Sequence, residues 1–328
     1  MRIERRLAAG RIKLGIMDFV EEVLRFLTAR MQIEEEWAVQ ERTSFTWWAH
    51  TLAQRVWVAE PREFQGVELR TLHIETDLLR DVPVDSSTWT RLSNVNQFAA
   101  LSAYVADTSR RTIKLHSSVS LTSDNWLLAR SIALHAMALQ MADAYAEAND
   151  LAEAFGAQVA ATPHPVRGLR ERADEMVNIL EVYQERGLGE SPFLPEEIAE
   201  LVHLEPRPWT MASSELLRLT ADLEFATDLP AHLELDASEK HASLGSGLQM
   251  RLMLPVEPDE AIAQKLNLNE CVEPDAHQLG AWCVDVERGL LFSGFVPAAA
   301  YTPGLSRALV YHLSAKNEWA RAVLFPAG

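Results

Sequence analysis

The residues of this chain with the most versatile chemistry are ten histidines and two cysteines. A structural zinc ion needs four ligands, commonly from close pairs of cysteines. Cys271, His277 and Cys283 are instead evenly spread, and no fourth ligand accompanies them. The histidines also lack the HExxH spacing that places two imidazoles on one face of a helix. We therefore expect no metal and no other cofactor.

Motifs for nucleophilic catalysis or phosphate binding give no stronger lead. Gly245-Ser246-Gly247 differs from the GxSxG turn of hydrolases, and the sequence contains neither a P-loop nor GxGxxG. His135 and His312 each follow an arginine by five residues, a spacing that does not bring two side chains together on a helix. The sequence therefore predicts a non-catalytic protein, and we name no catalytic residue.

Tryptophan and asparagine are better candidates for contact with a partner. Adjacent Trp47 and Trp48 would lie about 100° apart on a helix, so one of them should face a second element or a partner. Two pairs of asparagines recur at corresponding helix ends, where asparagine also suits the turn itself. The candidate partner-binding residues are Trp47, Trp48, Asn94, Asn96, Asn267 and Asn269.

Length and charge narrow the class of protein. The 328 residues suffice for two domains with a sizeable core, and 48% of them are hydrophobic. The net charge of −17 disfavours nucleic acid as a partner, because such binding depends on neutralising phosphates. The same charge favours a basic protein or peptide segment as the partner.

Two cysteines exclude a disulfide-rich scaffold, and no apolar run reaches the roughly 18 residues of a membrane span. The apolar stretch near the N-terminus is interrupted by charges, unlike a secretory signal. These features predict a cytoplasmic protein. The pattern of residues 17–36 predicts an amphipathic helix that packs on the protein's own core.

Periodicity and turn residues predict the same order of elements twice. In the first half we expect a helix over 43–52, strands over 55–59 and 67–76, a helix capped by Asp85, a hairpin over 99–118 and a long helix from Asp124. In the second half we expect a helix over 211–223, strands over 231–237 and 247–256, a helix over 261–268, a hairpin over 279–296 and a last helix from Pro303. Helices over 169–186, ended by Gly187, and 195–203 form a connector.

Four matched segments indicate a duplication. They are 94–97 with 267–270, 101–107 with 279–285, 128–130 with 305–307, and His135 with His312. The predicted fold class is α+β, with two tandem repeats of an antiparallel sheet flanked by helices, arranged as an internal pseudo-dimer. The protein would be a monomer or would pair again as a homodimer. The predicted domains are the N-terminal amphipathic helix (1–42), the first repeat (43–150), the helical connector (151–208) and the second repeat (209–328).

The two hairpin regions, residues 92–122 and 266–296, resemble the YbjN family of bacterial proteins. Each has a helix end with two asparagines, an aromatic-containing strand, a polar turn and a second strand before a long helix. The resemblance covers about 43–150 and 210–325. It implies a fold like that of type III secretion chaperones, which are small α/β proteins that dimerise and bind segments of partner proteins. It also implies a role as a regulator of signal transduction.

Three functions follow as hypotheses. The first is a non-catalytic protein-binding module, chaperone-like or regulatory, that holds a partner segment in a groove or on a sheet edge. The alternative is a small-molecule sensor or an enzyme with a site between the two repeats. The third is a structural protein that joins an assembly through its N-terminal helix.

Overall fold

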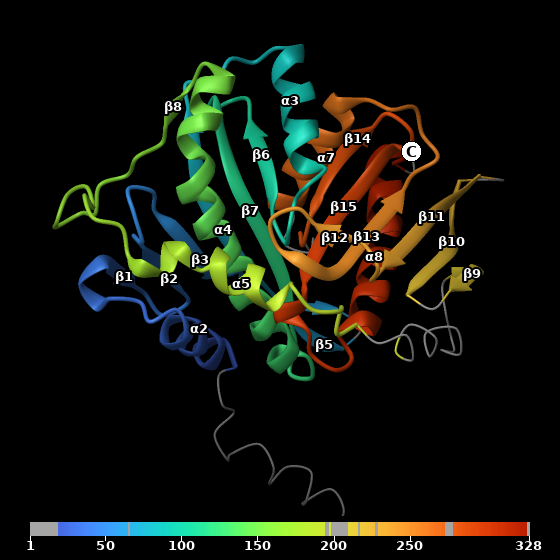
Figure 1. The fold of residues 1–328 in the computed structure, drawn as a ribbon, viewed down its shortest axis with the longest axis horizontal. Helices are drawn as coiled ribbons and strands as arrows, with labels where there is room; N and C mark the ends of the chain where they lie inside the picture. The colour runs from blue at the N-terminus through green and yellow to red at the C-terminus, as the bar shows by residue number, and fades with distance from the viewer. Residues whose placement is uncertain are drawn as a thin grey trace, which may run out of the picture.

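The computed structural model describes residues 19–64, 66–193, 197, 209–215, 217–226, 229–272 and 278–326. They form two antiparallel sheets with helices on their faces, so the predicted α+β class with two tandem repeats is confirmed (Figure 1). Within these residues, no helix has both the length and the apolar character needed to cross a bilayer. The expected helix over 195–203 lies outside the described residues, except for Glu197.

The strands of the first sheet are β1 (Ala38–Gln40), β2 (Ser44–Trp47), β3 (Gln54–Val58), β4 (Arg62–Phe64), β5 (Val67–Arg80), β6 (Ala103–Asp107), β7 (Thr112–Leu121) and β8 (Gln158–Val159). Those of the second sheet are β9 (Trp209–Glu215), β10 (Arg218–Ala226), β11 (Leu229–Asp236), β12 (Lys240–His241), β13 (Gly245–Met253), β14 (Ala281–Asp285) and β15 (Gly289–Pro297). The described helices are α2 (Phe19–Arg30), α3 (Ser86–Asn96), α4 (Trp126–Phe155), α5 (Leu180–Arg186), α7 (Glu260–Val272) and α8 (Leu305–Leu324), with 3-10 turns η2 (Glu35–Trp37), η3 (Glu175–Asn178) and η5 (Ala298–Ala300).

The two sheets share one topology. The first has the strand order β1-β2-β3-β5-β7-β6, and the second has β9-β10-β11-β13-β15-β14. The register matches as well, because Ala103 lies opposite His116 in the first hairpin and Ala281 lies opposite Ser293 in the second. The predicted pairing of residues 101–107 with 279–285 is therefore confirmed.

Each long helix covers one face of its own sheet and binds it through a polar side chain. In the first repeat, Gln140 of α4 donates to the carbonyl of Ile74 (3.2 Å) and accepts from the Thr76 hydroxyl (2.9 Å). In the second, Asn317 of α8 donates to the carbonyl of Glu224 (2.9 Å). Both polar side chains are buried, so these bonds fix how each helix sits on its strands.

Two expected helices are strands in the structure. Residues 43–52 contain β2, and residues 211–223 contain parts of β9 and β10. In β10, Leu219, Ala221 and Leu223 are buried at every second position, which is the period of a strand. Alanine, leucine and glutamate favour helix locally, but pairing with β11 outweighs that preference. Both errors fall at equivalent places in the two repeats.

The other predicted elements of the two repeats are confirmed with shifted ends. The Asp85 carboxylate accepts from the backbone N–H of Thr88 (3.0 Å) and caps α3. Gly156, with φ of +63°, ends α4. The N-terminal helix ends at Arg30, and its buried Val20, Val23 and Leu27 belong to the same core cluster as residues of both repeats.

The connector is mostly irregular chain. The expected single helix over 169–186 was wrong: between β8 and residue 193 the connector contains only η3 and α5, because residues 169–174 bind the first repeat as irregular chain. Gly187 ends α5 as expected. The backbone N–H of Asp174 donates to the carbonyl of Ala49 (2.7 Å), and the carbonyl of Gly187 accepts from Ser246 N–H (2.9 Å). The connector therefore packs first on one repeat and then on the other.

The free edges of β6 and β14 are closed by asparagine side chains. Asn96, at the end of α3, donates to the carbonyl of Tyr104 (3.0 Å) and accepts from its N–H (2.8 Å). Asn267 of α7 makes the same two bonds, both 2.8 Å, with Trp282 of β14. Asn96 is therefore the equivalent of Asn267. The predicted pairing of 94–97 with 267–270 was wrong by two residues, because both patterns have asparagines two apart.

The helices α3 and α7 also pack against the opposite repeat. α3 lies on β14 and α7 lies on β6. Ser93 of α3 accepts from the N–H of Val284 (2.7 Å), and Gln97 donates to its carbonyl (2.7 Å). The contacts between the repeats are thus reciprocal, which supports the expected pseudo-dimer; its symmetry stays a prediction.

Replacing either edge-closing asparagine should destabilise the fold. Asn96→Ala or Asn267→Ala leaves a buried N–H and a buried carbonyl without their partner, at an expected cost of about 2–4 kcal/mol. Asn94→Ala is the matched control, since Asn94 is exposed on the same helix, and should cost less than about 0.5 kcal/mol. Urea denaturation of the three variants measures this. Equal costs at positions 94 and 96 would contradict the role of Asn96.

Candidate functional site

The face of each sheet that is turned away from its long helix carries polar side chains, at equivalent positions in the two repeats. In the first sheet this face contains Arg55, Trp57, His73, Glu75 and His116, which register across β3, β5 and β7. In the second sheet it contains Glu234, Asp236, Gln249, Arg251 and Ser293, across β11, β13 and β15. We call these the first and second polar faces.

The first polar face is organised by two buried histidines. His73 Nδ1 lies 3.1 Å from His116 Nε2, and His116 Nδ1 lies 2.5 Å from the Oε1 of Gln278. Because an amide oxygen only accepts, His116 carries its proton on Nδ1 and accepts at Nε2. His73 therefore donates from Nδ1. This chain of bonds links β5 and β7 of the first repeat to a residue of the second.

The histidine pair is held neutral. Burial lowers the pKa of His73 to about 3, with a further lowering by His116, and burial lowers the pKa of His116 to about 3 as well. The ring of Trp57 stacks on His73 at 4.8 Å, and the guanidinium of Arg55 lies 4.8 Å from the Trp57 ring. Nearby, Lys114 donates to Glu75 at 2.5 Å.

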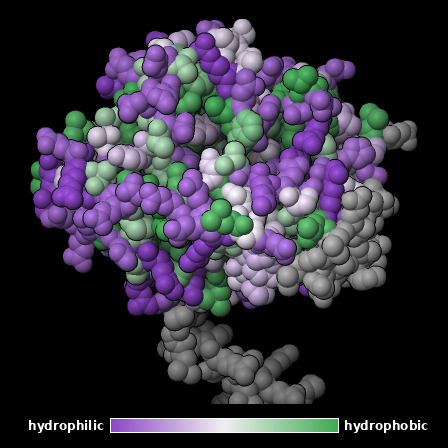
Figure 2. Space-filling model, in the orientation of Figure 1, coloured by the Kyte–Doolittle hydropathy of each residue, from purple (hydrophilic) through white to green (hydrophobic). Residues whose placement is uncertain are grey.

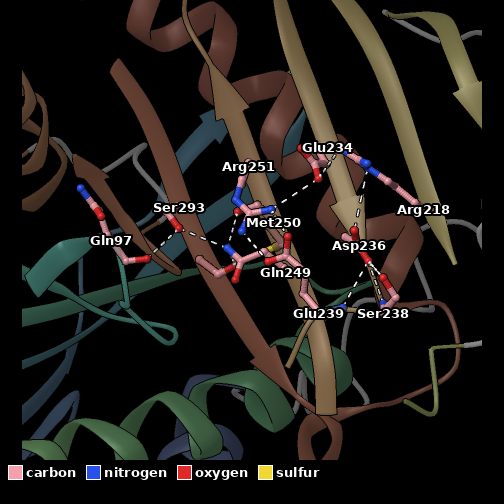
Figure 3. Close-up of polar contacts among 11 residues, drawn as sticks. Gln97, Arg218, Glu234, Asp236, Ser238, Glu239, Gln249, Met250, Arg251 and Ser293 are labelled. Atoms are coloured by element: carbon pink, nitrogen blue, oxygen red, sulfur yellow. Dashed lines mark hydrogen bonds and ion pairs between the residues drawn. The ribbon is translucent and has the colours of Figure 1, made fainter. Parts of the chain in front are cut away.

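The second polar face is an ionic network (Figure 3). Arg251 binds Glu239 through both terminal nitrogens, at 2.8 and 2.5 Å, and lies 3.4 Å from Glu234. Arg218 lies 3.0 Å from the same Glu234 oxygen. Asp236 accepts from the backbone N–H and the hydroxyl of Ser238, which fixes the turn after β11. Two guanidinium groups thus neutralise most of the charge of three carboxylates.

The carboxylates of Glu234, Asp236 and Glu239 have oxygens within 4.8 Å of one another, close enough to surround a cation. Hard cations such as Ca²⁺ take ligands of this kind. Here, however, all three carboxylates are already paired with guanidinium groups: Glu234 with Arg251 and Arg218, Glu239 with Arg251, and Asp236 with Arg218 at 3.9 Å. The arrangement is an ion-pair network that holds the turn carrying Glu239 against β13.

The two polar faces correspond bond by bond at the boundary between repeats. Gln249 donates to the Ser293 hydroxyl (3.1 Å), at the positions that His73 and His116 occupy in the first repeat. The Ser293 hydroxyl then donates to the carbonyl of Gln97 in the first repeat (3.2 Å). In the same way, His116 of the first repeat binds Gln278 of the second. Each face therefore ends in a contact with the opposite repeat.

A third feature is a groove between the first turns of α4 and α8, with a volume of about 280 Å³. We call it the α4–α8 groove. Its main apolar lining residues are Leu128, Ile132, Leu279, Leu305, Ala308 and Leu309. Leu128 and Leu305 belong to the segments matched in the sequence, and Ile132 and Leu309 each follow one helical turn later. Both repeats thus contribute equivalent side chains to one apolar groove.

A larger hollow of about 680 Å³ lies beside the connector, next to Trp37 and Arg170. Arg170 is buried and donates to the carbonyl of Trp48 (2.6 Å). It also pairs with Glu34 (2.6 Å) and Asp174 (3.4 Å). The chain's own carboxylates bind this guanidinium. The Arg170 side chain therefore connects the connector to the first repeat.

The predicted partner-binding tryptophans are buried within the chain. Trp47 is 0% exposed in the core, and its neighbour Trp48 faces the connector. The indole N–H of Trp48 donates to the carbonyl of Thr162 (2.9 Å), and its ring lies 4.8 Å from that of His164. Alternation along a strand, not rotation around a helix, turns the two side chains apart.

The predicted asparagines divide into two kinds. Asn96 and Asn267 are buried and bind the strand edges described above. Asn94 is exposed and Asn269 is half-buried, and the two lie on different helices. Partner contact at any of the six predicted residues stays a prediction. Sequence reasoning did not find the α4–α8 groove, although the matched segments 128–130 and 305–307 pointed to its two walls.

Comparison of the chain with family models, with curated proteins and with solved structures finds no match. The function proposed below therefore rests on the geometry of this chain.

The histidine pair predicts a loss of stability in acid. In the unfolded chain a histidine has a pKa of about 6.5, above the value of about 3 in the fold, so protonation favours unfolding. Stability present at neutral pH should fall as the pH drops below about 6.5, towards the folded pKa. His116→Gln should reduce the loss between pH 6.5 and 5 by on the order of 2 kcal/mol. Urea denaturation at several pH values tests this; the same pH slope in variant and parent would contradict it.

The ionic network predicts unequal roles for its two arginines. Arg251→Met leaves Glu239 without its two bonds and a buried Glu234 with less compensation, at an expected cost of about 3 kcal/mol. Arg218→Met should cost less than about 1 kcal/mol, because that side chain is 45% exposed. Thermal and urea denaturation of the pair of variants compare them. If both substitutions cost the same, the proposed division of roles is wrong.

Proposed function

We propose that this protein is a non-catalytic binding module that holds an apolar segment of a partner protein in the α4–α8 groove. The observation that carries the proposal is the groove itself, with equivalent leucines from both repeats on its walls. A surface of this kind serves helix-in-groove and similar modes of peptide recognition, in which a few apolar side chains of the partner are buried.

The size of the groove favours a protein segment over a small molecule. Sites that enclose small ligands usually measure about 300–1,000 Å³ and add a few converging polar groups. The groove, at about 280 Å³, is at the lower end of that range and is lined mainly by aliphatic side chains, with Ser120, Asn125, Tyr311 and His312 as its polar lining residues. Its volume suits one or two apolar side chains that project from a longer segment, with the rest of the segment outside.

Charge and surface character support the same class of function. The net charge of −17 favours a basic partner. On the face shown in Figure 2, hydrophilic residues predominate and hydrophobic ones lie in small separate groups. The resemblance to the YbjN family points to the same class, a chaperone-like or regulatory protein of the cytoplasm.

One observation favours the alternative, a small-molecule sensor or an enzyme with a site between the repeats. The His73–His116–Gln278 chain brings titratable groups to that boundary. Such clusters are common in active sites, although structural networks produce them too. His116 is fully buried, which favours a structural role.

The test places a photo-crosslinking amino acid at Ala315, an exposed residue that lines the groove, in the protein expressed in its native host. The matched control carries it at Glu318, exposed on the same helix but outside the groove. We expect a recurrent adduct at position 315, identified by mass spectrometry, whose crosslinked peptide contains an apolar segment. Equal crosslinking at both positions would refute the proposal.

A second pair of variants tests the chemistry of the contact. Leu128→Asp puts a charge on the groove wall and should abolish the adduct at position 315. Leu127→Asp, on the exposed neighbour, should leave it unchanged. Melting temperatures of both variants verify that each is folded. An adduct that survives Leu128→Asp in a folded protein would contradict the role of the groove.

A further inference from the structure

The α4–α8 groove lies close to the point where the described chain begins. The ring of Phe19, the first residue of α2, lies 6.0 Å from the guanidinium carbon of Arg70. Arg70 is paired across the sheet with Leu121, the last residue of β7. Leu121 directly follows Ser120, which lines the groove together with Asn125. The first residue of α2 therefore lies near the β7 end of the groove.

Contacts further along α2 place the helix on an adjoining face of α4, roughly 100° around the helix axis from the nearest lining residue of the groove. The guanidinium of Arg130 on α4 lies 4.4 Å from the ring of Phe26, and α2 packs along α4. Arg130 directly follows Ala129, a lining residue of the groove. Figure 1 shows the start of α2 beside the lower end of α4. The start of α2 is thus separated from the groove by the first turns of α4.

Residues 1–18 have the length to occupy the groove. Eighteen residues span up to about 60 Å when extended and about 27 Å as a helix. The part of the groove formed by α4 runs only from Asn125 to Ile132, about 10 Å along the helix axis. Length therefore allows the segment to turn back and lie along the whole groove.

The composition of residues 1–18 suits such a site. The segment has five basic and two acidic residues, so it is positively charged in a chain whose net charge is −17. It also contains Ile3 and Leu7, four residues apart, and the apolar pairs Ile12/Leu14 and Ile16/Met17. It therefore offers the combination proposed above for the partner: apolar side chains in a basic segment.

We propose that residues 1–18 dock in the α4–α8 groove of the same chain and compete with the partner segment for it. The competition rests on the proposed function of the groove, whereas the docking itself does not. The N-terminal segment is then an internal regulator: a partner must displace it, so its affinity for the groove sets the concentration at which the partner binds.

Disulfide trapping in the full-length chain tests the docking without any partner. One variant combines Ala8→Cys with Ala308→Cys, on the groove wall. The matched control combines Ala8→Cys with Glu68→Cys, an exposed residue two positions from Arg70 and so also near Phe19. The single variant Ala8→Cys measures any reaction with native Cys271 and Cys283.

We expect an intramolecular disulfide to form at least about tenfold faster with position 308 than with position 68, because docking raises the effective concentration at the groove. Arg5→Glu combined with Arg6→Glu should slow the reaction at position 308. Equal rates at 308 and 68 would overturn the proposal. An intermolecular disulfide would overturn it as well, since the occupant would then belong to a second copy.

The crosslinking experiment and the disulfide-trapping experiment test the two proposals separately. Crosslinking of a partner at position 315 without disulfide formation at 308 would refute self-docking and keep the proposed function. A fast intramolecular disulfide without a partner adduct would keep self-docking and refute the partner-binding function.

Discussion

The structure depends on how the open edges of β6 and β14 are closed. Each is the last strand of its sheet, and an exposed edge of this kind leaves backbone N–H and carbonyl groups ready to pair with another chain. Asn96 and Asn267 each satisfy one donor and one acceptor on these edges. A side-chain amide has the same donor and acceptor pair as a peptide unit. It can therefore satisfy the edge groups that an additional strand would otherwise bind, and the sheet ends there.

Closing the edges in this way lets the two sheets meet without merging into one. The space beside each edge is filled by a helix of the opposite repeat, α3 on β14 and α7 on β6. Among the residues that the structure describes, direct backbone pairing between the repeats is then limited to short bridges, such as the two bonds between Ser118 and Gln278. The same exchange brings Gln278 to His116 and Gln97 to Ser293, so the polar faces are completed by the other repeat.

Equivalent positions in the two repeats hold different chemistry. The first polar face has a neutral histidine pair with a stacked tryptophan, and the second has arginine–carboxylate pairs. The apolar walls of the α4–α8 groove, in contrast, keep leucine at equivalent places in both helices. We infer that the groove is the feature that both repeats serve together, and this is why the proposed function is located there.

The sequence by itself determined the duplication, both hairpins, the Asp85 cap and the long helices, because each of these leaves a local signal of period, turn or cap. It also contained the strand period of β10, which the local preference of alanine, leucine and glutamate for helix obscured. Only the tertiary structure decided that β2 and β10 are strands, since pairing with β3 and β11 provides the energy. Only the tertiary structure matched Asn96 with Asn267 and brought Leu128 beside Leu305, because residues far apart in the chain become neighbours through packing that no local pattern records.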